Sequence, residues 1–227
     1  MEGVKRDMTK LECIHIGKTL RGVTVLHDIN LELESGKVYG FWGKNGCGKT
    51  MLMRVVGNLI RPTAGEIRIN GMAVSRLQKY PVSIGALIEN PAFLGECTGL
   101  ENLRILASIR ERISEEEIRE SLAKVGLDPD DKRTYRKYSL GMKQRLGIAC
   151  AVMERPEIVM LDEPINAIDE AGVSAVRSIL EECRERGALV LIACHDKDEM
   201  KLLADEVFFM EEGTITRRWG KEEMNAW

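Results

Sequence analysis

The stretch GKNGCGKT, residues 43–50, constrains the fold of this 227-residue chain more than any other. It satisfies the pattern G-x-x-x-x-G-K-[ST], follows the strand-like run KVYGFW and precedes the helix-periodic run TMLMRVVGNLI. Glycines at this spacing let successive backbone N–H groups converge on one phosphate, and the following helix N-terminus favours negative charge. An ordinary glycine turn explains such a loop less well when both flanks are present. We therefore predict a strand, a phosphate-binding loop and a helix that continues to Pro62.

The apolar runs around this unit predict an α/β fold. LECIHI, VTVLHDINLEL and EIRINGM alternate like strands and predict a small antiparallel sheet near the N-terminus. SIGALI, EIVMLDEP and ALVLIAC are short and apolar throughout, as strands of parallel sheets are, and the helical stretch DEAGVSAVRSILEECRERG separates the last two. EVFFM predicts a final strand, and the turn EEG then leads to TITRRW.

A helical insert interrupts this strand pattern. Ser114 and Glu117 form a capping box that opens ISEEEIRESLAKVG, and Gly126 with Pro129 ends that helix. We find neither a repeat nor a linker, so the sequence predicts one domain over residues 1–227. Its parts are a core that carries the phosphate loop and an antiparallel β-subdomain, at 1–89 and 156–227, and a helical subdomain at 90–155.

Composition argues against several classes of protein. The net charge of −3, from 33 basic and 36 acidic residues, gives no basic surplus for nucleic-acid binding. Six scattered cysteines form no C-x-x-C pair, so we expect reduced thiols in a cytoplasmic protein. The start MEGVKRDMTK lacks the apolar core of a signal peptide, and ALVLIAC is too short to span a bilayer. A membrane role would therefore need a partner.

Two adjacent acids end the strand IVMLD at the sheet edge where ligands bind in such folds. We assign Asp162 to Mg²⁺ and Glu163 to the base that accepts a proton from attacking water. The hydroxyl of Thr50 supplies a second Mg²⁺ ligand. A polar strand end with a helix-capping acid is the alternative, less favoured beside a phosphate loop.

Two further polar residues follow neighbouring strands. His195 follows ALVLIAC and is predicted to sense the γ-phosphate and order the water, although a structural histidine is the alternative. Glu89 follows SIGALI at the junction with the helical insert, where it either touches Mg²⁺ and water or lies in solvent. Phe93 and Leu94, just beyond, either face a partner or pack inside the insert.

A second anion site is predicted in YSLGMKQR, residues 138–145. Ser139, Leu140 and Gly141 form a turn at the head of the helical run GIACAVM, and such a helix start offers free backbone N–H groups. The chain thus carries two predicted phosphate sites far apart in the sequence.

In this order, these motifs resemble the nucleotide-binding subunit of an ABC transporter over nearly the whole chain. GKNGCGKT resembles Walker A, IVMLDEP Walker B, YSLGM the LSGGQ signature and INAID the D-loop, and His195 stands at the switch histidine. The resemblance implies a P-loop NTPase core of ABC ATPase type that binds ATP and Mg²⁺ and hydrolyses ATP. It also implies that two subunits pair head to tail, so that Ser139 and Gly141 of one cover the ATP of the other.

The resemblance extends the nucleotide site to neighbouring residues and implies a membrane partner. The partner is a separate transmembrane permease, expected to contact the insert near residues 90–100, which holds the chain at the inner face of the membrane. The residues expected to contact the nucleotide are Gly43, Lys44, Asn45, Gly46, Cys47, Gly48, Lys49, Thr50, Met51, Ser139, Gly141 and Asp169. Those expected at the metal are Thr50, Glu89 and Asp162, and those expected in catalysis are Glu163, His195 and Glu89.

The sequence departs from the family pattern in three places, the first of which covers two positions. Leu140 and Met142 replace a glycine and the glutamine of the signature, but Ser139 and Gly141 are kept. Leu20 stands where an aromatic residue usually stacks on adenine, so base affinity is expected to be weaker and a preference for ATP over GTP is left open. Glu89 stands where the Q-loop has glutamine.

The stretches IGALIENPAF and YSLGMKQRLGIA resemble the branch that exports peptide antibiotics such as bacitracin and lantibiotics. A soluble ABC-type ATPase that acts as a nucleic-acid or assembly switch is the alternative, but the chain has no heptads, no C-x-x-C and one phosphate loop. A P-loop kinase would leave YSLGMKQR and INAID unexplained.

Overall fold

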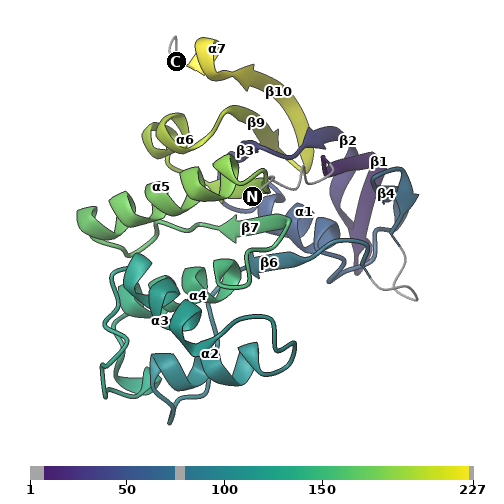
Figure 1. Cartoon of the computed structure of the whole chain (residues 1–227). Coiled ribbons are helices and arrows are strands. Elements are labelled where there is room, and N and C mark those ends of the chain that lie inside the picture. Colours follow the sequence, from purple (N-terminus) through teal and green to yellow (C-terminus); the bar gives the residue numbers. More distant parts are fainter. Residues whose placement is uncertain (1–7, 75–79, 225–227) are drawn as a thin grey trace.

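The structure is a computed structural model that describes residues 8–74 and 80–224 (Figure 1). It contains a six-stranded sheet of order β10-β9-β3-β8-β7-β6 and a four-stranded sheet of order β2-β1-β4-β5. The strands are β1 Lys10–Leu20, β2 Val23–Glu34, β3 Lys37–Trp42, β4 Ala64–Ile69, β5 Met72–Ala73, β6 Ile84–Leu87, β7 Ile158–Asp162, β8 Leu189–Cys194, β9 Glu206–Glu211 and β10 Thr214–Gly220. The helices are α1 Lys49–Val56, α2 Gly99–Ala107, α3 Glu115–Lys124, the 3₁₀ turn η1 Tyr135–Lys137, α4 Leu140–Val152, α5 Glu170–Glu185, α6 Lys197–Leu203 and α7 Lys221–Met224.

The large sheet brings the predicted motifs to one edge. Strands β6, β7, β8, β3 and β9 run parallel, and β10 pairs antiparallel with β9. Asp162 pairs with Ala193, and Trp42 pairs with Cys194, so β3, β7 and β8 end at the same level. The segments that follow these strands therefore leave the sheet side by side. The antiparallel sheet of β1, β2, β4 and β5 is also present, which confirms the predicted α/β class.

Apolar side chains fill both faces of the large sheet, because successive strand residues point to opposite sides. On β7, Met160 packs with α1 and the antiparallel sheet, whereas Val159 and Leu161 pack with the helices on the other face. Helix α1 contacts both β7 and β2 and lies between the two sheets (Figure 1). This double burial explains why β7 and β8 are apolar at nearly every position.

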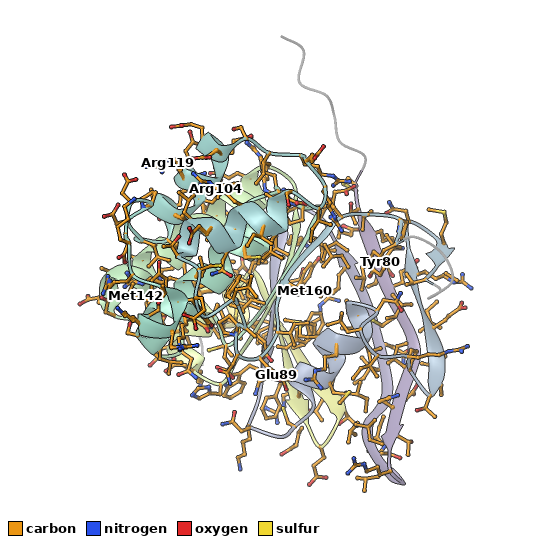
Figure 2. The ribbon with its side chains drawn as sticks, turned by 90° about the horizontal axis from the view of Figure 1, so that it is seen from below. Tyr80, Glu89, Arg104, Arg119, Met142 and Met160 are labelled. Atoms are coloured by element: carbon orange, nitrogen blue, oxygen red, sulfur yellow. The ribbon has the colours of Figure 1, made fainter. Side chains whose placement is uncertain are left out.

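Helices α2, α3 and α4, which form the helical part of the chain at residues 90–155, lie to one side of the sheets (Figure 1). Helix α4 joins it to the core by packing on β6 and β7, and the predicted capping box of Ser114 and Glu117 opens α3. Figure 2 shows Arg104 and Arg119 of this part away from Met160 in the core. None of the helices in the described ranges has both the length and the apolar character needed to cross a membrane.

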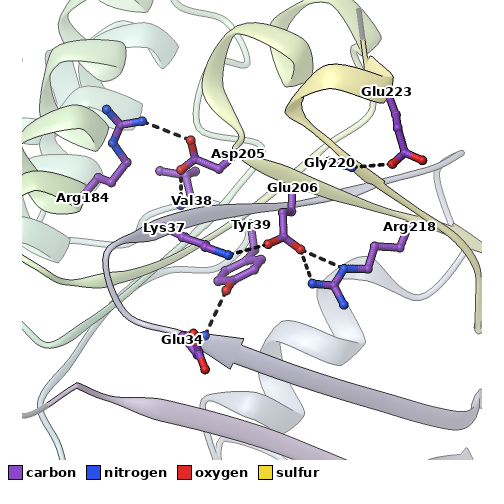
Figure 3. A network of polar contacts seen from close by, with 10 residues as sticks. All are labelled: Glu34, Lys37, Val38, Tyr39, Arg184, Asp205, Glu206, Arg218, Gly220 and Glu223. Carbon is purple, nitrogen blue, oxygen red and sulfur yellow. Dashed lines mark hydrogen bonds and ion pairs between the residues drawn. The ribbon is translucent and has the colours of Figure 1, made fainter. Parts of the chain in front are cut away.

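Polar contacts fix the opposite end of β3 to the strands beside it (Figure 3). Glu206 of β9 accepts hydrogen bonds from Lys37 Nζ at 2.8 Å and from Arg218 Nε at 2.8 Å. Burial alone would raise the pKa of Glu206, but these two partners outweigh it and hold the pKa below its ordinary value of 4.5. Asp205 Oδ2 accepts from the backbone N–H of Val38 at 2.9 Å. The phosphate loop therefore follows a strand that is anchored at its start.

The prediction that the helix after the phosphate loop continues to Pro62 is wrong. Helix α1 ends at Val56, and Asn58 adopts a left-handed conformation with φ of 55°. The N–H groups of Leu59 and Ile60 both donate to the carbonyl of Arg54, which satisfies an orphan acceptor at the helix end. A Cβ at Gly57 would lie 2.7 Å from Met160 Cε, so this glycine lets the helix end approach β7 closely.

Candidate active site

The phosphate loop connects β3 to α1 and needs its glycines for two reasons. Gly48, directly before α1, has φ of 109°, a conformation that side chains disfavour. At Gly43 the limit is space, because a Cβ would lie 2.2 Å from the carbonyl oxygen of Met210. The loop thus curls tightly over the start of α1, where backbone N–H groups are free to bind an anion.

Lys49 places a positive charge in the centre of this loop. Its side chain is buried, and Nζ donates to the carbonyl of Gly43 at 2.7 Å and to that of Lys44 at 3.3 Å. Nζ also lies 4.0 Å from Glu163 Oε1. The ammonium group is therefore held in place before any phosphate binds.

Thr50 and Asp162 meet beside the loop with oxygen atoms suited to a hard cation. Thr50 Oγ1 donates to Asp162 Oδ2 at 2.6 Å, and Asp162 is 4% exposed. Burial raises the pKa of Asp162, the Thr50 hydrogen bond opposes the rise, and the nearby Glu163 carboxylate adds to it. Its Oδ1 atom is buried without a hydrogen-bond partner among the described residues. An orphaned carboxylate oxygen next to a hydroxyl fits Mg²⁺, which takes one or two protein oxygens and completes its shell with water and phosphate.

No wider cage of ligands surrounds this pair. In the part of the chain that the structure describes, no cluster of three or more His, Cys, Asp or Glu residues could hold a metal ion. A cation bound by Thr50 and Asp162 would complete its shell with water and phosphate oxygens.

The structure brings Glu163 and His195 together, as the sequence predicts. His195 Nδ1 lies 2.8 Å from Glu163 Oε2, and the backbone carbonyl of His195 accepts from Trp42 Nε1 at 3.1 Å. Glu163 has φ of 48° and precedes Pro164, which is an unusual backbone conformation for a residue with a side chain. This turn directs the carboxylate toward the phosphate loop, within reach of Lys49.

Glu89 lies near the same loop, but its carboxylate has a different partner. It forms an ion pair with Arg54 of α1, and its side chain is about half exposed. Glu89 also has a left-handed backbone, with φ of 61°. It lines an open cavity of about 430 Å³ beside the loop together with Val25, Asn45, Gly46, Gly48, Lys49, Thr50, Met51, Arg54 and Glu163.

Ser139 and Gly141 lie away from this cavity. None of the residues from 138 to 145 is part of its lining. Ser139 is exposed, and its Oγ accepts from Met142 N at 3.2 Å to cap α4. Leu140 in the first turn is 59% exposed. Figure 2 shows Met142 and Glu89 well separated. The second predicted anion site therefore faces outward and is not part of the chain's own phosphate site.

Asp169 also has a local role that the sequence does not predict. Its carboxylate caps α5 by accepting from Gly172 N at 2.9 Å and forms an ion pair with Arg145. The hydrogen bond from Gly172 holds the pKa of Asp169 below its usual range.

Two contacts at the site come from residues that sequence analysis does not select. Gln144 Nε2 donates to the backbone carbonyl of Glu163 at 2.9 Å, and Arg54 pairs with Glu89. Gln144 follows Gly141 by three positions, so helical spacing predicts that both lie on one face of α4. That spacing gives no indication of which segment the face contacts.

Comparison with known proteins decides the family. The ABC transporter family matches residues 26–166 of this chain. The chain belongs to the ABC transporter family. It is 41% identical over 205 residues to the uncharacterized ABC transporter ATP-binding protein YybJ of Bacillus subtilis (strain 168), across 90% of this chain and 94% of that protein.

Two further relatives have names that refer to peptide antibiotics. The bacitracin transport ATP-binding protein BcrA of Enterococcus faecalis is 38% identical over 95% of this chain and 70% of its own length. The lantibiotic transport ATP-binding protein SrtF of Streptococcus pyogenes is 37% identical over 85% of this chain and 82% of its own length.

Solved structures agree with the fold. An ATP-binding cassette in a dimeric, post-hydrolysis state bound to ADP and Pi superposes with a TM-score of 0.86 at 21% identity, covering 93% of this chain and 98% of its own. The ATP-binding subunit of an ABC transporter superposes with a TM-score of 0.84 at 24% identity, covering 94% of this chain and 90% of its own.

The prediction of an ATP-hydrolysing subunit of an ABC transporter is confirmed by the family match and the relatives, and the switch and kinase alternatives are not supported.

Proposed function

We propose that this chain hydrolyses Mg-ATP in a site completed by a second ATPase subunit, and that the cycle drives a separate permease for export of antibiotic peptides or similar compounds. The observation that carries the proposal is the separation of two helix starts. Lys49, Thr50, Asp162 and Glu163 meet at the start of α1, whereas Ser139 at the start of α4 faces outward. A neighbouring subunit can use such an exposed start, because a two-fold pair uses the same surfaces twice.

The residues from Gly43 to Met51 bind the phosphates of ATP in this proposal. The loop N–H groups and Lys49 hold the β- and γ-phosphates, and Thr50 with Asp162 holds Mg²⁺. Mg²⁺ neutralises the charge that develops on the phosphates when it is bound. Leu20, at the end of β1, offers no ring to stack on the base, so the phosphates supply most of the affinity.

Glu163 acts as the base toward the attacking water. Its carboxylate lies next to Lys49 and is hydrogen bonded by His195, which fixes its orientation. His195 is half-exposed at the sheet edge, where it can also contact the γ-phosphate. The ion pair between Glu89 and Arg54 opens or persists depending on whether nucleotide is bound in the cavity. In this way Glu89 reports the presence of nucleotide to the helical part.

Ser139, Gly141 and the start of α4 cover the ATP of the neighbouring subunit. The exposed helix start provides backbone N–H groups for the γ-phosphate. Asp169 is held next to α4 by its ion pair with Arg145 of that helix. The dimer would close when ATP is bound and open after hydrolysis, a shift between two populations.

The helical part, residues 90–155, is the proposed contact with the permease, and the remaining ranges form the ATP-binding core. Phe93 is partly buried and packs edge to face on Tyr135, with ring centroids 5.3 Å apart, whereas Leu94 is 56% exposed and offers more surface to a partner. Ile105 on α2 and Ile109, two residues after its end, are also exposed. The permease would hold the chain at the cytoplasmic face of the membrane. The names of the BcrA and SrtF relatives support a peptide antibiotic as cargo.

Steady-state ATPase activity, measured across a wide range of protein concentration, tests the shared site. The rate per subunit should rise with concentration, because only pairs are active. Glu163→Gln should slow hydrolysis by about 10²- to 10⁴-fold and accumulate a dimer with Mg-ATP that light scattering detects. A rate that is independent of concentration, together with a variant that stays monomeric with ATP, would contradict the proposal.

A further inference from the structure

The start of α4 is attached to the turn that carries Glu163. Gln144 Nε2 donates to the backbone carbonyl of Glu163 at 2.9 Å. The same carbonyl also accepts from the backbone N–H of Asn166 at 3.2 Å, which closes the turn. One turn of chain, the segment from Glu163 to Asn166, is thus held internally by its own backbone and externally by a side chain of α4.

Two neighbouring contacts strengthen the attachment. A Cβ at Gly141 would lie 2.6 Å from the carbonyl oxygen of Ala167, so the helix and this segment approach each other very closely. Arg145, next to Gln144, forms an ion pair with Asp169. The segment from Glu163 to Asp169 and the first turns of α4 therefore form one packed unit, and close-packed units move together.

The Gln144 contact is made where the backbone most needs support. Glu163 has φ of 48° and precedes a proline, and both features disfavour its conformation unless the surroundings impose it. Gln144 is 7% exposed, so its amide has little access to water, and its Nε2 atom donates to the carbonyl of Glu163 instead. The direction of the Glu163 side chain depends on the orientation of this peptide group.

We propose that Gln144 is a positioning residue, which holds the carboxylate of Glu163 in its productive orientation and couples the signature helix to the base of the same subunit. The inference rests on the roles proposed above for Glu163 and Ser139. When Ser139 and Gly141 bind the ATP of the neighbouring subunit, a displacement of α4 is transmitted through Gln144 to Glu163 of its own site. Each site in the dimer thereby responds to the occupancy of the other.

The variant Gln144→Met tests this role, because it keeps the length of the side chain and removes the donor. The Asn166 bond still satisfies the Glu163 carbonyl, so the chain should fold. We expect kcat to fall by about 10- to 100-fold, as a displaced catalytic group implies, while the KM for ATP changes by less than about twofold because the phosphate loop is untouched. Gln144→Asn, whose shorter side chain cannot reach the carbonyl, is the second variant if the first does not fold.

Asn102→Leu is the matched control. Asn102 is also a buried amide in the helical part and also bonds backbone groups, accepting from Leu94 N at 2.8 Å and donating to Thr98 O at 2.9 Å. It has no contact with Glu163 among those described, so its loss should lower the melting temperature and leave kcat of the folded protein unchanged.

Combining Gln144→Met with Glu163→Gln shows whether the loss of kcat in Gln144→Met arises through Glu163 or from a general disturbance of the structure. If Gln144 acts through Glu163, the double variant keeps the residual rate of Glu163→Gln alone. A further tenfold fall in the double variant, or a wild-type kcat in Gln144→Met, would overturn the inference. The proposed function has a separate test: if Glu163→Gln alone still hydrolyses ATP at the wild-type rate, the role of Glu163 as the base is wrong, whatever Gln144 does.

Discussion

The helix starts of α1 and α4 are both predicted anion sites, and the structure equips them very differently. At α1, the buried Lys49 occupies the loop and Thr50 meets Asp162 at 2.6 Å, beside an open cavity. At α4, the exposed Ser139 caps its own helix, and the adjacent Leu140 is 59% exposed. The first site holds charge and reactive groups, and the second offers backbone N–H groups on an open surface.

This difference teaches that the two helix starts are suited to separate tasks, as the proposed function requires. Chemistry needs groups held rigidly before the substrate arrives, and the α1 site achieves this with buried hydrogen bonds. Recognition between subunits, the role proposed for the α4 site, needs an accessible surface, and Ser139 is exposed there. The rear of α4 contacts the segment behind Glu163, so a surface with that role would be connected to the proposed base of its own subunit.

The largest expected effects come from disabling each site separately. Lys49→Ala should abolish ATP binding as well as hydrolysis, because the loop loses its only buried cation among the described residues. Ser139→Arg should leave ATP affinity of the isolated chain within about twofold and still reduce hydrolysis by at least about 100-fold, since a large side chain blocks the neighbour's site. Fluorescent-nucleotide titration and ATPase assays measure both quantities. An equal loss of ATP affinity in Ser139→Arg would break the comparison.

Asp162→Asn should raise the stability of the nucleotide-free protein and lower its rate of hydrolysis. Burial raises the pKa of Asp162 in the folded state, so its protonation stabilises the fold at low pH, and this contribution is lost as pH rises through the folded pKa. The neutral variant lacks that penalty, and without nucleotide it should melt at a higher temperature than wild type at pH 7. Its hydrolysis should fall by at least about 100-fold because Mg²⁺ loses a ligand. A lower melting temperature at pH 7 would contradict this account of Asp162.

Gly141→Ala should have an intermediate effect. The added Cβ would lie 2.6 Å from the carbonyl oxygen of Ala167, so the contact between α4 and its rear segment must open. We expect the free energy of unfolding to fall by about 1–3 kcal/mol in urea titrations, as overpacking usually costs. Gly95→Ala is the control, because the nearest atom to its Cβ would be Arg136 Nε at 3.7 Å. Equal stability of the two variants would mean that the contact is loose.

Glu206→Gln, far from both sites, should have the smallest effect. Its partners Lys37 and Arg218 are about half exposed, so we expect a loss of at most about 1 kcal/mol. The pKa of Glu206 is held below 4.5, so the wild-type contribution is present at neutral pH and is lost as pH falls through the folded pKa. Urea unfolding should therefore show a difference between variant and wild type that shrinks under acid conditions. A difference that grows in acid would reverse the assignment.

Local sequence rules predict the first site well and the second only in part. The glycine spacing, the capping box at Ser114 and the cap by Ser139 depend on neighbours in sequence, and the structure contains all three. Helix α1 ends at Val56, where Gly57 lies close to Met160 and Asn58 is left-handed, and Gln144 contacts a turn nineteen positions further along the chain. Contacts of this kind depend on how elements pack, which periodicity and spacing do not determine.

Mixing Lys49→Ala with Ser139→Arg tests the shared site most directly. Neither variant alone should hydrolyse ATP, but a mixed pair contains one site with an intact phosphate loop and an intact Ser139. Random pairing makes about half of the dimers mixed, each with one working site, so activity should rise clearly above that of either variant alone. The upper bound is about a quarter of the wild-type rate per chain, which is reached when the working site does not need ATP in the other. A mixture no more active than its two components would contradict the claim that each subunit completes the site of the other.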